Sequence, residues 1–468
     1  MMSLKRIEPI LMAAMALSFA SAPSFAQKQT PPTGGPPKAF ALPAHESYTL
    51  PNGLQVTLVP YGVIPKVTAS LAVRAGNVNQ TPEQYGVASI LGNLLKEGTS
   101  TRSAKQLAEE FAQMGGDLNA GVGEDESSFT TDVLSEFGPE AVKLLADVAQ
   151  HPLLPESEIV RLKNDAVRQV TIARSIPQQI ANERFRKILY ADHPYGRVLP
   201  AAEDIQKQSI ENARAFYRGN FVAARAHLYV AGRFDNAAMK KAIAESFAGW
   251  VKGAPAANVP PKPQPKRVLD VTDRPGAAQS TIYVGLPVPP ANSPDNIPLG
   301  VMNSLLGGSF GSRITTNIRE QKGYTYSPNS QISRRMHDAY WVETADVTTA
   351  ATGPSLKEIF GEVERLQKEA PSAAELQGIQ SYLSGLFVIQ NSTRGALIGQ
   401  LRYVDLQDLG EGYLKTYVQK VNAVTPADVQ RMTAQYIKPD HMTIVVVGDK
   451  AKISEQLAPY VAAGDSNK

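Results

Sequence analysis

The sequence of 468 residues contains no cysteine and only six histidines. Without cysteine the chain cannot use a thiol nucleophile, a cysteine zinc site or an iron–sulfur cluster. Its formal net charge at pH 7 is only +3, and the basic residues are spread along the chain. The dense basic patch that marks a nucleic-acid-binding protein is therefore missing.

The histidines are too dispersed to form a local metal site, because no two lie within one or two helical turns of each other. Two of them precede proline, which places them in loops or at the ends of elements. Assembly of distant histidines in the folded chain stays open. A nucleophile elbow of the Gly-x-Ser-x-Gly type is also missing, since residues 309–312 read Ser-Phe-Gly-Ser. The histidines are His45, His151, His193, His227, His337 and His441.

The N-terminus has the pattern of a signal peptide. Lys5 and Arg6 precede an apolar run over residues 10–20, and Ser24-Phe25-Ala26 offers a cleavage site, with residues 20–22 as a second option. The run is shorter than the ~20 residues that span a bilayer, although a retained membrane anchor is the alternative. No later stretch is long and apolar enough to span. We therefore expect a mature chain that is free in the periplasm.

Two proline-rich stretches divide the sequence. Residues 27–43 form a leader, and residues 252–266 read KGAPAANVPPKPQPK, which is typical of an extended linker. At roughly 100–200 residues per domain, the length predicts two to three domains. The predicted organisation is a signal peptide (1–26), a leader (27–45), an N-terminal domain (46–251), a linker (252–267), a C-terminal domain (268–461) and a tail (462–468).

The two halves resemble each other, which indicates an internal duplication. In each half a helix begins near Gly-Pro and is followed by a second helix that carries a Glu at the corresponding position. Each half then ends with an apolar strand whose last residue is Gly. The offset between the halves stays between 215 and 219 residues; chance similarity of helices is the alternative. The matching segments are 138–142 and 353–357, Glu158 and Glu375, and Tyr217–Gly232 and Tyr436–Gly448.

Hydrophobic periodicity predicts an α+β fold. The alternating residues of the first half indicate strands, and the segments with helical spacing lie between them. Such runs favour a sandwich in each half, with a mixed or antiparallel sheet that carries helices on one face. The predicted strands are 54–60, 67–73, 118–120 and 127–133, and the predicted helices are 84–96 and 104–114.

Four segments carry a resemblance to a known family. They are Pro51-Asn52-Gly53-Leu54, Arg74-Ala75-Gly76, the helix GVASILGNLLKEGT over residues 86–99, and Asn119-Ala120. Together they resemble the pitrilysin/insulinase superfamily of zinc peptidases, which includes the mitochondrial processing peptidases. The resemblance runs from Tyr48 to Tyr460. It implies two tandem homologous α/β sandwich domains.

In active members of that superfamily this helix carries His-x-x-Glu-His, which binds zinc and supplies the general base. The resemblance places these positions on Ser89, Gly92 and Asn93. A hydroxyl, a hydrogen atom and a carboxamide replace two imidazoles and a carboxylate. The third ligand of the family, a Glu, would fall near Arg168-Gln169-Val170, where no carboxylate stands. We therefore expect no metal or other cofactor in this chain.

The second half carries a further motif. A strand over residues 280–286 and a helix precede the segment LGGSFGSR (306–313), and a helix to Glu320 ends at a Lys322-Gly323 turn. Tyr324 and Tyr326 are then expected on one face of the next strand.

This block resembles the C-terminal signature of the same superfamily, in which an Arg and a Tyr hold the substrate backbone and stabilise the tetrahedral intermediate. The matching residues are Arg319 and Tyr326. Alternatively, Arg319 only complements a helix dipole and Tyr326 is a core residue. Substrate contacts are also expected from Gly307, Gly308, Ser309 and Phe310. The glycines of this loop, Gly311 included, let a peptide approach or merely shape a turn.

Some members of the superfamily form a chamber from two different subunits, of which one carries zinc. The resemblance thus implies a non-catalytic, substrate-binding subunit of a periplasmic heterodimeric zinc metallopeptidase. Its partner would be a zinc-bearing paralogue, and its substrates peptides or unfolded polypeptides added to sheet edges at residues 118–122 and 341–348. The alternative for both segments is an ordinary paired strand. The alternatives are a non-enzymatic peptide-binding or scaffold protein, and a chain active alone through an unrecognised site. The choice between heterodimer and homodimer stays open.

Overall fold

A computed structural model describes residues 40–257, 259–263, 265–410 and 412–461. The predicted signal peptide, most of the predicted leader and the predicted tail lie outside these residues. Among the helices that are described, none has the length and apolar character needed to cross a membrane.

The first sheet has the strand order β1-β2-β6-β3-β5-β4. It is mixed, because β6 runs parallel to β2 and antiparallel to β3. Along β5 buried and half-buried residues alternate, as expected for a strand with one face in the core. The strands are β1 (Glu46–Thr49), β2 (Gln55–Pro60), β3 (Lys66–Val73), β4 (Asn119–Val122), β5 (Ser127–Leu134) and β6 (Ala226–Gly232).

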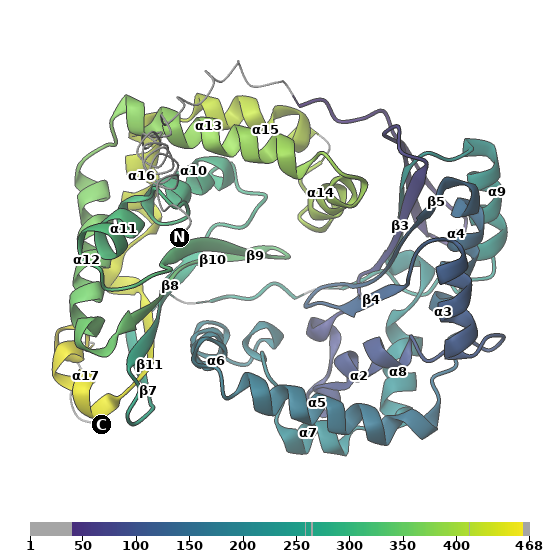
Figure 1. The fold of residues 1–468 in the computed structure, drawn as a ribbon, viewed down its shortest axis with the longest axis horizontal. Coiled ribbons are helices and arrows are strands. Elements are labelled where there is room, and N and C mark those ends of the chain that lie inside the picture. Colours follow the sequence, from purple (N-terminus) through teal and green to yellow (C-terminus); the bar gives the residue numbers. More distant parts are fainter. Residues whose placement is uncertain (1–39, 258, 264, 411, 462–468) are drawn as a thin grey trace, which may run out of the picture. The chain divides into compact units, whose positions relative to one another are not determined.

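The second sheet has the strand order β7-β11-β8-β10-β9 and repeats the topology of the first. Its last strand in sequence, β11, again lies parallel to one neighbour, β7, and antiparallel to the other, β8. The predicted internal repeat therefore extends to the strand order of the two sheets. Figure 1 shows one sheet in each half of the chain. The strands are β7 (Val268–Asp273), β8 (Gln279–Val288), β9 (Asn329–Arg335), β10 (Asp338–Thr348) and β11 (Thr443–Gly448).

Helices cover one face of each sheet and bury a separate apolar core against it. The helices of the first half are α2 (Val87–Leu94), α3 (Ala104–Gln113), α4 (Gly138–Gln150), α5 (Ile159–Ala173), α6 (Pro177–Tyr190), α7 (Ala202–Lys207), α8 (Ile210–Asn220) and α9 (Asn236–Phe247). Those of the second half are α10 (Asn296–Leu306), α11 (Arg313–Thr315), α12 (Thr352–Lys368), α13 (Ala373–Gln390), α14 (Arg394–Leu406), α15 (Gly412–Ala423), α16 (Pro426–Tyr436) and α17 (Lys450–Leu457). The predicted α+β class is confirmed; the predicted domain boundaries stay a prediction.

Local chemistry sets several element bounds. Ser103 and Gln106 form a reciprocal capping box that starts α3 where the sequence predicts it. The helix predicted over residues 84–96 is shorter in the structure. Gly86 has a φ of 94°, so the backbone turns there and α2 begins only at Val87.

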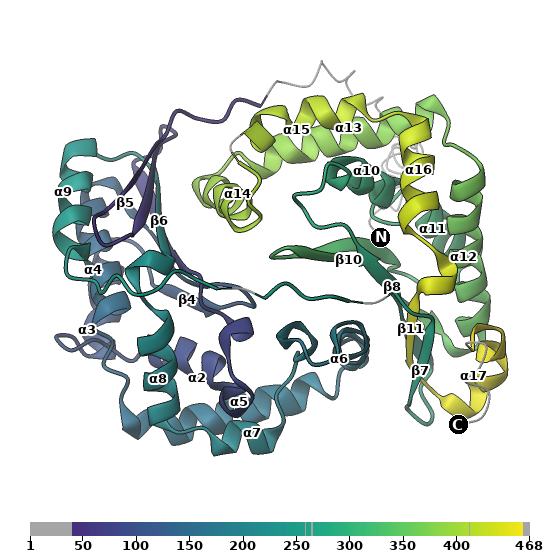
Figure 2. The same cartoon turned by 180° about the vertical axis from the view of Figure 1, so that it is seen from behind.

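The second face of each sheet is partly covered by a helix from the other half, which the sequence analysis did not anticipate. Helix α14 packs on Val59, Ala72 and Tyr229 of the first sheet. Helix α6 packs on Val342 and Val447 of the second sheet (Figure 2). Each half thus contributes one helix that packs on the sheet of the other half.

The two predicted sheet edges differ in outcome. Strand β4 is an edge of the first sheet, so the prediction for residues 118–122 is confirmed. The prediction for residues 341–348 is wrong, because β10 lies between β8 and β9. Residues 329–335 form β9, which precedes β10 in a hairpin and is itself the edge strand of the second sheet.

Candidate functional site

The three positions that match the zinc motif lie on α2, and the two with polar side chains are bonded to their own helix. The Ser89 hydroxyl donates to the Gly86 carbonyl at 2.9 Å. The Asn93 amide donates to the Ser89 carbonyl at 3.1 Å. Neither group matches the imidazole or carboxylate ligands that zinc prefers.

The position of the general base is also closed by packing. Gly92 is buried, and a Cβ atom placed there would lie 2.8 Å from Cγ2 of Val122 on β4. The valine side chain therefore occupies the space that any side chain at residue 92 would need. At the three positions that match the motif, the structure thus contains no zinc-ligand side chain, and at Gly92 the neighbouring Val122 side chain fills the space.

In the region predicted for the third zinc ligand, the carboxylates are paired with arginines. Arg168 pairs with Asp165 at 3.0 Å. The other nearby carboxylates, Glu97 and Glu158, lie 2.5 and 2.6 Å from Arg161. Within the described ranges no group of three or more His, Asp or Glu residues could hold a metal ion.

The residues matching the C-terminal signature form one cluster. Arg319 lies on a π-helical segment (Thr316–Gln321), a geometry found often at functional sites. Its guanidinium carbon is 4.3 Å from the ring centre of Phe310 and 4.9 Å from that of Tyr326. Both rings are strongly exposed, at 71% and 80%. An arginine in contact with two exposed rings is preorganised by cation–π interactions. Its Nε lies 3.3 Å from the Glu320 carboxylate, and its remaining N–H groups are donors that a ligand can use.

The strand expected at Tyr324 and Tyr326 is not present, so that prediction is wrong. Only Thr325 forms an isolated bridge, to Val347, and β9 begins at Asn329. The Tyr324 amide donates to the Ile318 carbonyl, so this segment closes the end of the π-helix. Tyr324 packs against the core of the second half whereas Tyr326 is exposed, so the two rings do not share a face.

The glycine pair of the predicted substrate loop is required by packing. A Cβ on Gly307 would lie 2.6 Å from both the Glu343 carboxylate and the Ser330 hydroxyl, and one on Gly308 would overlap the Asn303 amide. This geometry supports the turn-shaping alternative for the two glycines. Of the four predicted loop residues, Phe310 is the one stacked on Arg319.

Glu343 is a residue that the sequence analysis missed. It is fully buried on β10, and burial raises its pKa well above the ordinary value, while the backbone at Asn329 opposes that rise. Neither of its carboxyl oxygens has a side-chain partner in the described structure. The signal was present in the sequence, since Glu343 follows the apolar run Tyr340-Trp341-Val342.

The α2 positions and the Arg319 cluster are not joined within this chain. No hydrogen bond, ion pair or ring contact connects them in the described structure. The α2 positions lie in the helical layer that packs on the first sheet. Arg319 lies on the π-helical segment, which contacts α11 and α12 in the second half.

Sequence-family models match most of the chain. One described as "Insulinase (Peptidase family M16)" matches residues 59–203, and one described as "Peptidase M16 inactive domain" matches residues 208–383. An uncharacterized zinc protease of Bacillus subtilis is 24% identical over 85% of this chain and 97% of its own. One of Streptomyces coelicolor is 22% identical over 88% of this chain and 92% of its own.

Solved structures share the fold. A crystal structure titled as a peptidase M16 inactive domain from Pseudomonas fluorescens has a TM-score of 0.81 and 22% identity, and it covers 86% of this chain and 98% of its own. A protease from Helicobacter pylori has a TM-score of 0.80 and 21% identity, over 87% of this chain and 100% of its own.

Proposed function

The chain belongs to peptidase family M16, the insulinase family, and from this premise we propose that it is the non-catalytic, substrate-binding subunit of a periplasmic heterodimeric zinc metallopeptidase. Its partner is a paralogous subunit that carries His-x-x-Glu-His and the zinc ion. This chain supplies Arg319 and Tyr326 to the partner's site. Peptides or unfolded polypeptides are the substrates.

One observation carries the proposal: the arginine of the family signature is stacked between exposed rings while the α2 helix offers no ligands. A guanidinium and a phenol donate hydrogen bonds to peptide carbonyls, and donors placed where charge develops lower the barrier of acyl transfer. Such donors need a metal-bound water to act with. Residues 89, 92 and 93 do not supply one, so the metal must come from a second subunit.

The free edge of β4 gives the substrate a place to bind. An extended peptide can pair with the backbone of an edge strand, whatever its sequence. Asn119 and Gly121 are exposed on β4, so the edge is accessible. A backbone-directed contact suits unfolded segments of varied sequence.

The test is joint activity with the zinc-bearing paralogue from the same organism. Both chains are purified and mixed, and cleavage of a quenched-fluorescence peptide is measured. Arg319→Ala and Tyr326→Phe are each expected to lower joint kcat/KM about tenfold or more, because each removes a transition-state donor. Arg218→Ala and Tyr382→Phe, which change exposed residues elsewhere, serve as matched controls.

Gel filtration of each mixture separates lost assembly from lost chemistry. If the assembled complex of the Arg319 and Tyr326 variants cleaves as fast as the unchanged pair, the supply of these residues to the partner is wrong.

The tight contact between Gly92 and Val122 also favours a second candidate, a non-enzymatic peptide-binding or scaffold member of the family. It predicts saturable peptide binding without turnover in every pairing. Turnover with the paralogue excludes it.

A further inference from the structure

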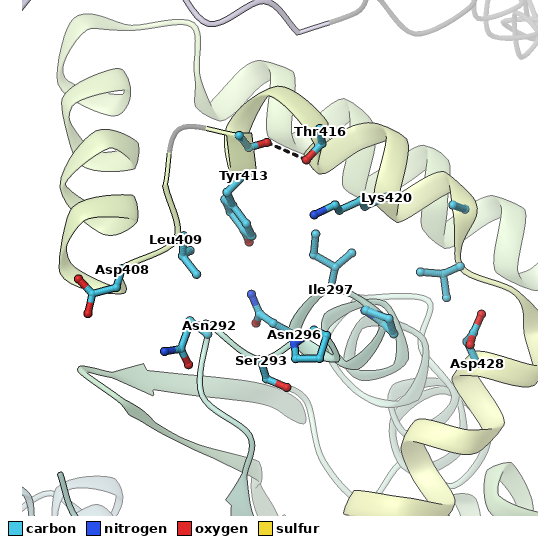
Figure 3. Close-up of a pocket in the computed structure, with 16 residues that line it drawn as sticks. Asn292, Ser293, Asn296, Ile297, Asp408, Leu409, Tyr413, Thr416, Lys420 and Asp428 are labelled. Carbon is cyan, nitrogen blue, oxygen red and sulfur yellow. Dashed lines mark hydrogen bonds between the residues drawn. The ribbon is translucent and has the colours of Figure 1, made fainter. Parts of the chain in front are cut away.

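Two adjoining cavities lie in the second half, where α10 begins beneath α15 (Figure 3). The larger has a volume of about 700 Å³ and the smaller about 220 Å³. Asn296, Ile297 and Tyr413 line both, so these residues form the wall that the two cavities share. Their size is that of a site for a small ligand.

The guanidinium of Arg334 lines the smaller cavity. Its Nε and Nη2 donate to the side-chain Oδ1 of Asn296 at 2.9 and 2.7 Å. No carboxylate of the described residues lies within ion-pair distance of it. A half-buried guanidinium bonded only to a neutral amide loses hydration and keeps unused donors, which favours an anion beside it.

Asn296 adds a buried amide beside Arg334. The residue is 3% exposed, and hydrogen bonding from its amide opposes the rise that burial causes in the pKa of Tyr403 and Tyr413. Its Nδ2 does not reach full hydrogen-bond geometry with any described residue, so a ligand oxygen would compete with the two hydroxyls for this donor. Figure 3 shows Asn296 between Tyr413 and Ser293 in the interior of the larger cavity.

Aromatic rings form the walls. Tyr403, Tyr413 and Tyr417 surround the smaller cavity, and Phe387 stacks on Tyr417 with ring centres 4.4 Å apart. Burial raises the pKa of the three phenols, and the Arg334 charge opposes the rise, which places the guanidinium within electrostatic reach of all three. The cavity therefore combines a positive charge, hydroxyl groups and apolar ring surface.

The rim of the larger cavity limits the charge of the ligand. Lys420 extends over it and has no ion-pair partner in the described structure (Figure 3). Asp408 and Asp428 line opposite ends of the cavity. His337 lies 3.5 Å from Asp408 and Arg431 lies 3.4 Å from Asp428, so the two carboxylates disfavour a doubly charged anion less strongly than unpaired ones would. A ligand with one negative charge and apolar substituents fits both the donors and these carboxylates.

We propose that the two cavities bind a short peptide through its free C-terminal carboxylate. The carboxylate accepts from Arg334 and, in competition with the Tyr403 and Tyr413 hydroxyls, from Nδ2 of Asn296. The last side chain lies against the stacked rings of Phe387 and Tyr417. The preceding residues run through the larger cavity past Ile297 towards Lys420. This site lies in the second half alone and does not depend on the zinc-bearing partner.

Calorimetry of the isolated chain with the tripeptide Ala-Ala-Phe tests the site. The free acid is expected to bind at least tenfold more tightly than its C-terminal amide, and N-acetylation is expected to change binding less than threefold. Arg334→Gln should weaken the free acid at least tenfold, and Lys420→Met about threefold. Lys357→Met, which removes an exposed lysine from α12, is the matched control and should have no effect.

Equal binding of acid and amide, or no saturable binding at millimolar peptide, overturns the proposal. Displacement of the tripeptide by inorganic phosphate at equal concentration overturns the assignment to a monocarboxylate. If Arg334→Gln fails to fold, as judged by its thermal transition, the double variant Tyr413→Phe with Lys420→Met takes its place. Unchanged binding by that variant also overturns the proposal.

Discussion

At the scale of single residues, the helix α2 that matches the family's zinc motif is shaped by a close contact at Gly92. Gly92 does more than omit a carboxylate, because its missing side chain lets Val122 of β4 approach the helix. Protein interiors are close-packed, so this contact cannot be altered from one side alone. Restoring the motif residues would therefore conflict with the strand.

Gly92→Glu is expected to lower the free energy of unfolding by about 1–3 kcal/mol, because the new side chain overlaps Val122. Adding Val122→Ala should recover part of that loss. Urea denaturation of the single and double variants measures the coupling. Gly378→Ala on α13, where nothing lies near the new methyl group, is the control and should raise the unfolding free energy by about 0.5–1 kcal/mol. Equal losses for the single and double variants would contradict the packing argument.

Sequence reasoning identified the residues of the motif but not their surroundings. The assignment of the motif positions to Ser89, Gly92 and Asn93 follows from the resemblance of the helix to that of active family members. The valine that fills the space comes from a strand about 30 residues later, and periodicity does not give the register of such a packing contact. Likewise the Arg319–Tyr326 pair was identified from the resemblance of its segment to the family signature, whereas the exposure of Tyr326 depended on where β9 begins.

At the scale of elements, α14 is held on the first sheet by ion pairs along its length. Arg394 at its start lies 2.9 Å from Asp132, and Asp405 near its end lies 3.0 Å from Arg74. Although burial alone would raise the pKa of Asp405, hydrogen bonds from His227 and Arg74 and the charge of Arg74 lower it to about 2. Asp405 is thus ionised in the folded chain at any pH above that value.

The depressed pKa of Asp405 predicts that the folded chain loses stability as the pH falls into the acid range. The stabilisation is complete above the ordinary pKa of 3.8 and is lost as the pH falls towards about 2. The side chain is 32% exposed, so we expect a contribution of about 1–2 kcal/mol after allowance for solvent screening. Asp405→Asn should remove this amount at neutral pH and flatten the stability profile below pH 4.

Urea midpoints between pH 2 and pH 7 measure this effect. Asp192→Asn, which changes an exposed aspartate, should leave the profile as it is. An unchanged acid limb in Asp405→Asn would show that the pair with Arg74 does not stabilise α14.

At the scale of the whole molecule, the halves are joined by more than a linker. Phe185 of α6 is fully buried against the second sheet, where Gly285 leaves room for its ring. Glu124, which follows β4, pairs with both Arg186 of α6 and Arg335 of β9. The duplication was visible in the sequence, but the exchange of α6 and α14 was not. An amphipathic pattern gives the apolar face of a helix and not the sheet that it covers.

This exchange predicts that the proline-rich linker is dispensable for holding the halves together. With a protease site placed within residues 252–266, the cleaved chain is expected to elute from gel filtration as one species, because each half covers apolar surface of the other.

Phe185→Ala should lower the free energy of unfolding by about 3–5 kcal/mol and release the halves after cleavage at a lower urea concentration. Phe111→Ala, which removes a ring from the core of the first half alone, should destabilise the chain similarly without selectively weakening the association. If the cleaved, unsubstituted chain separates in buffer, the exchanged helices do not hold the two halves together.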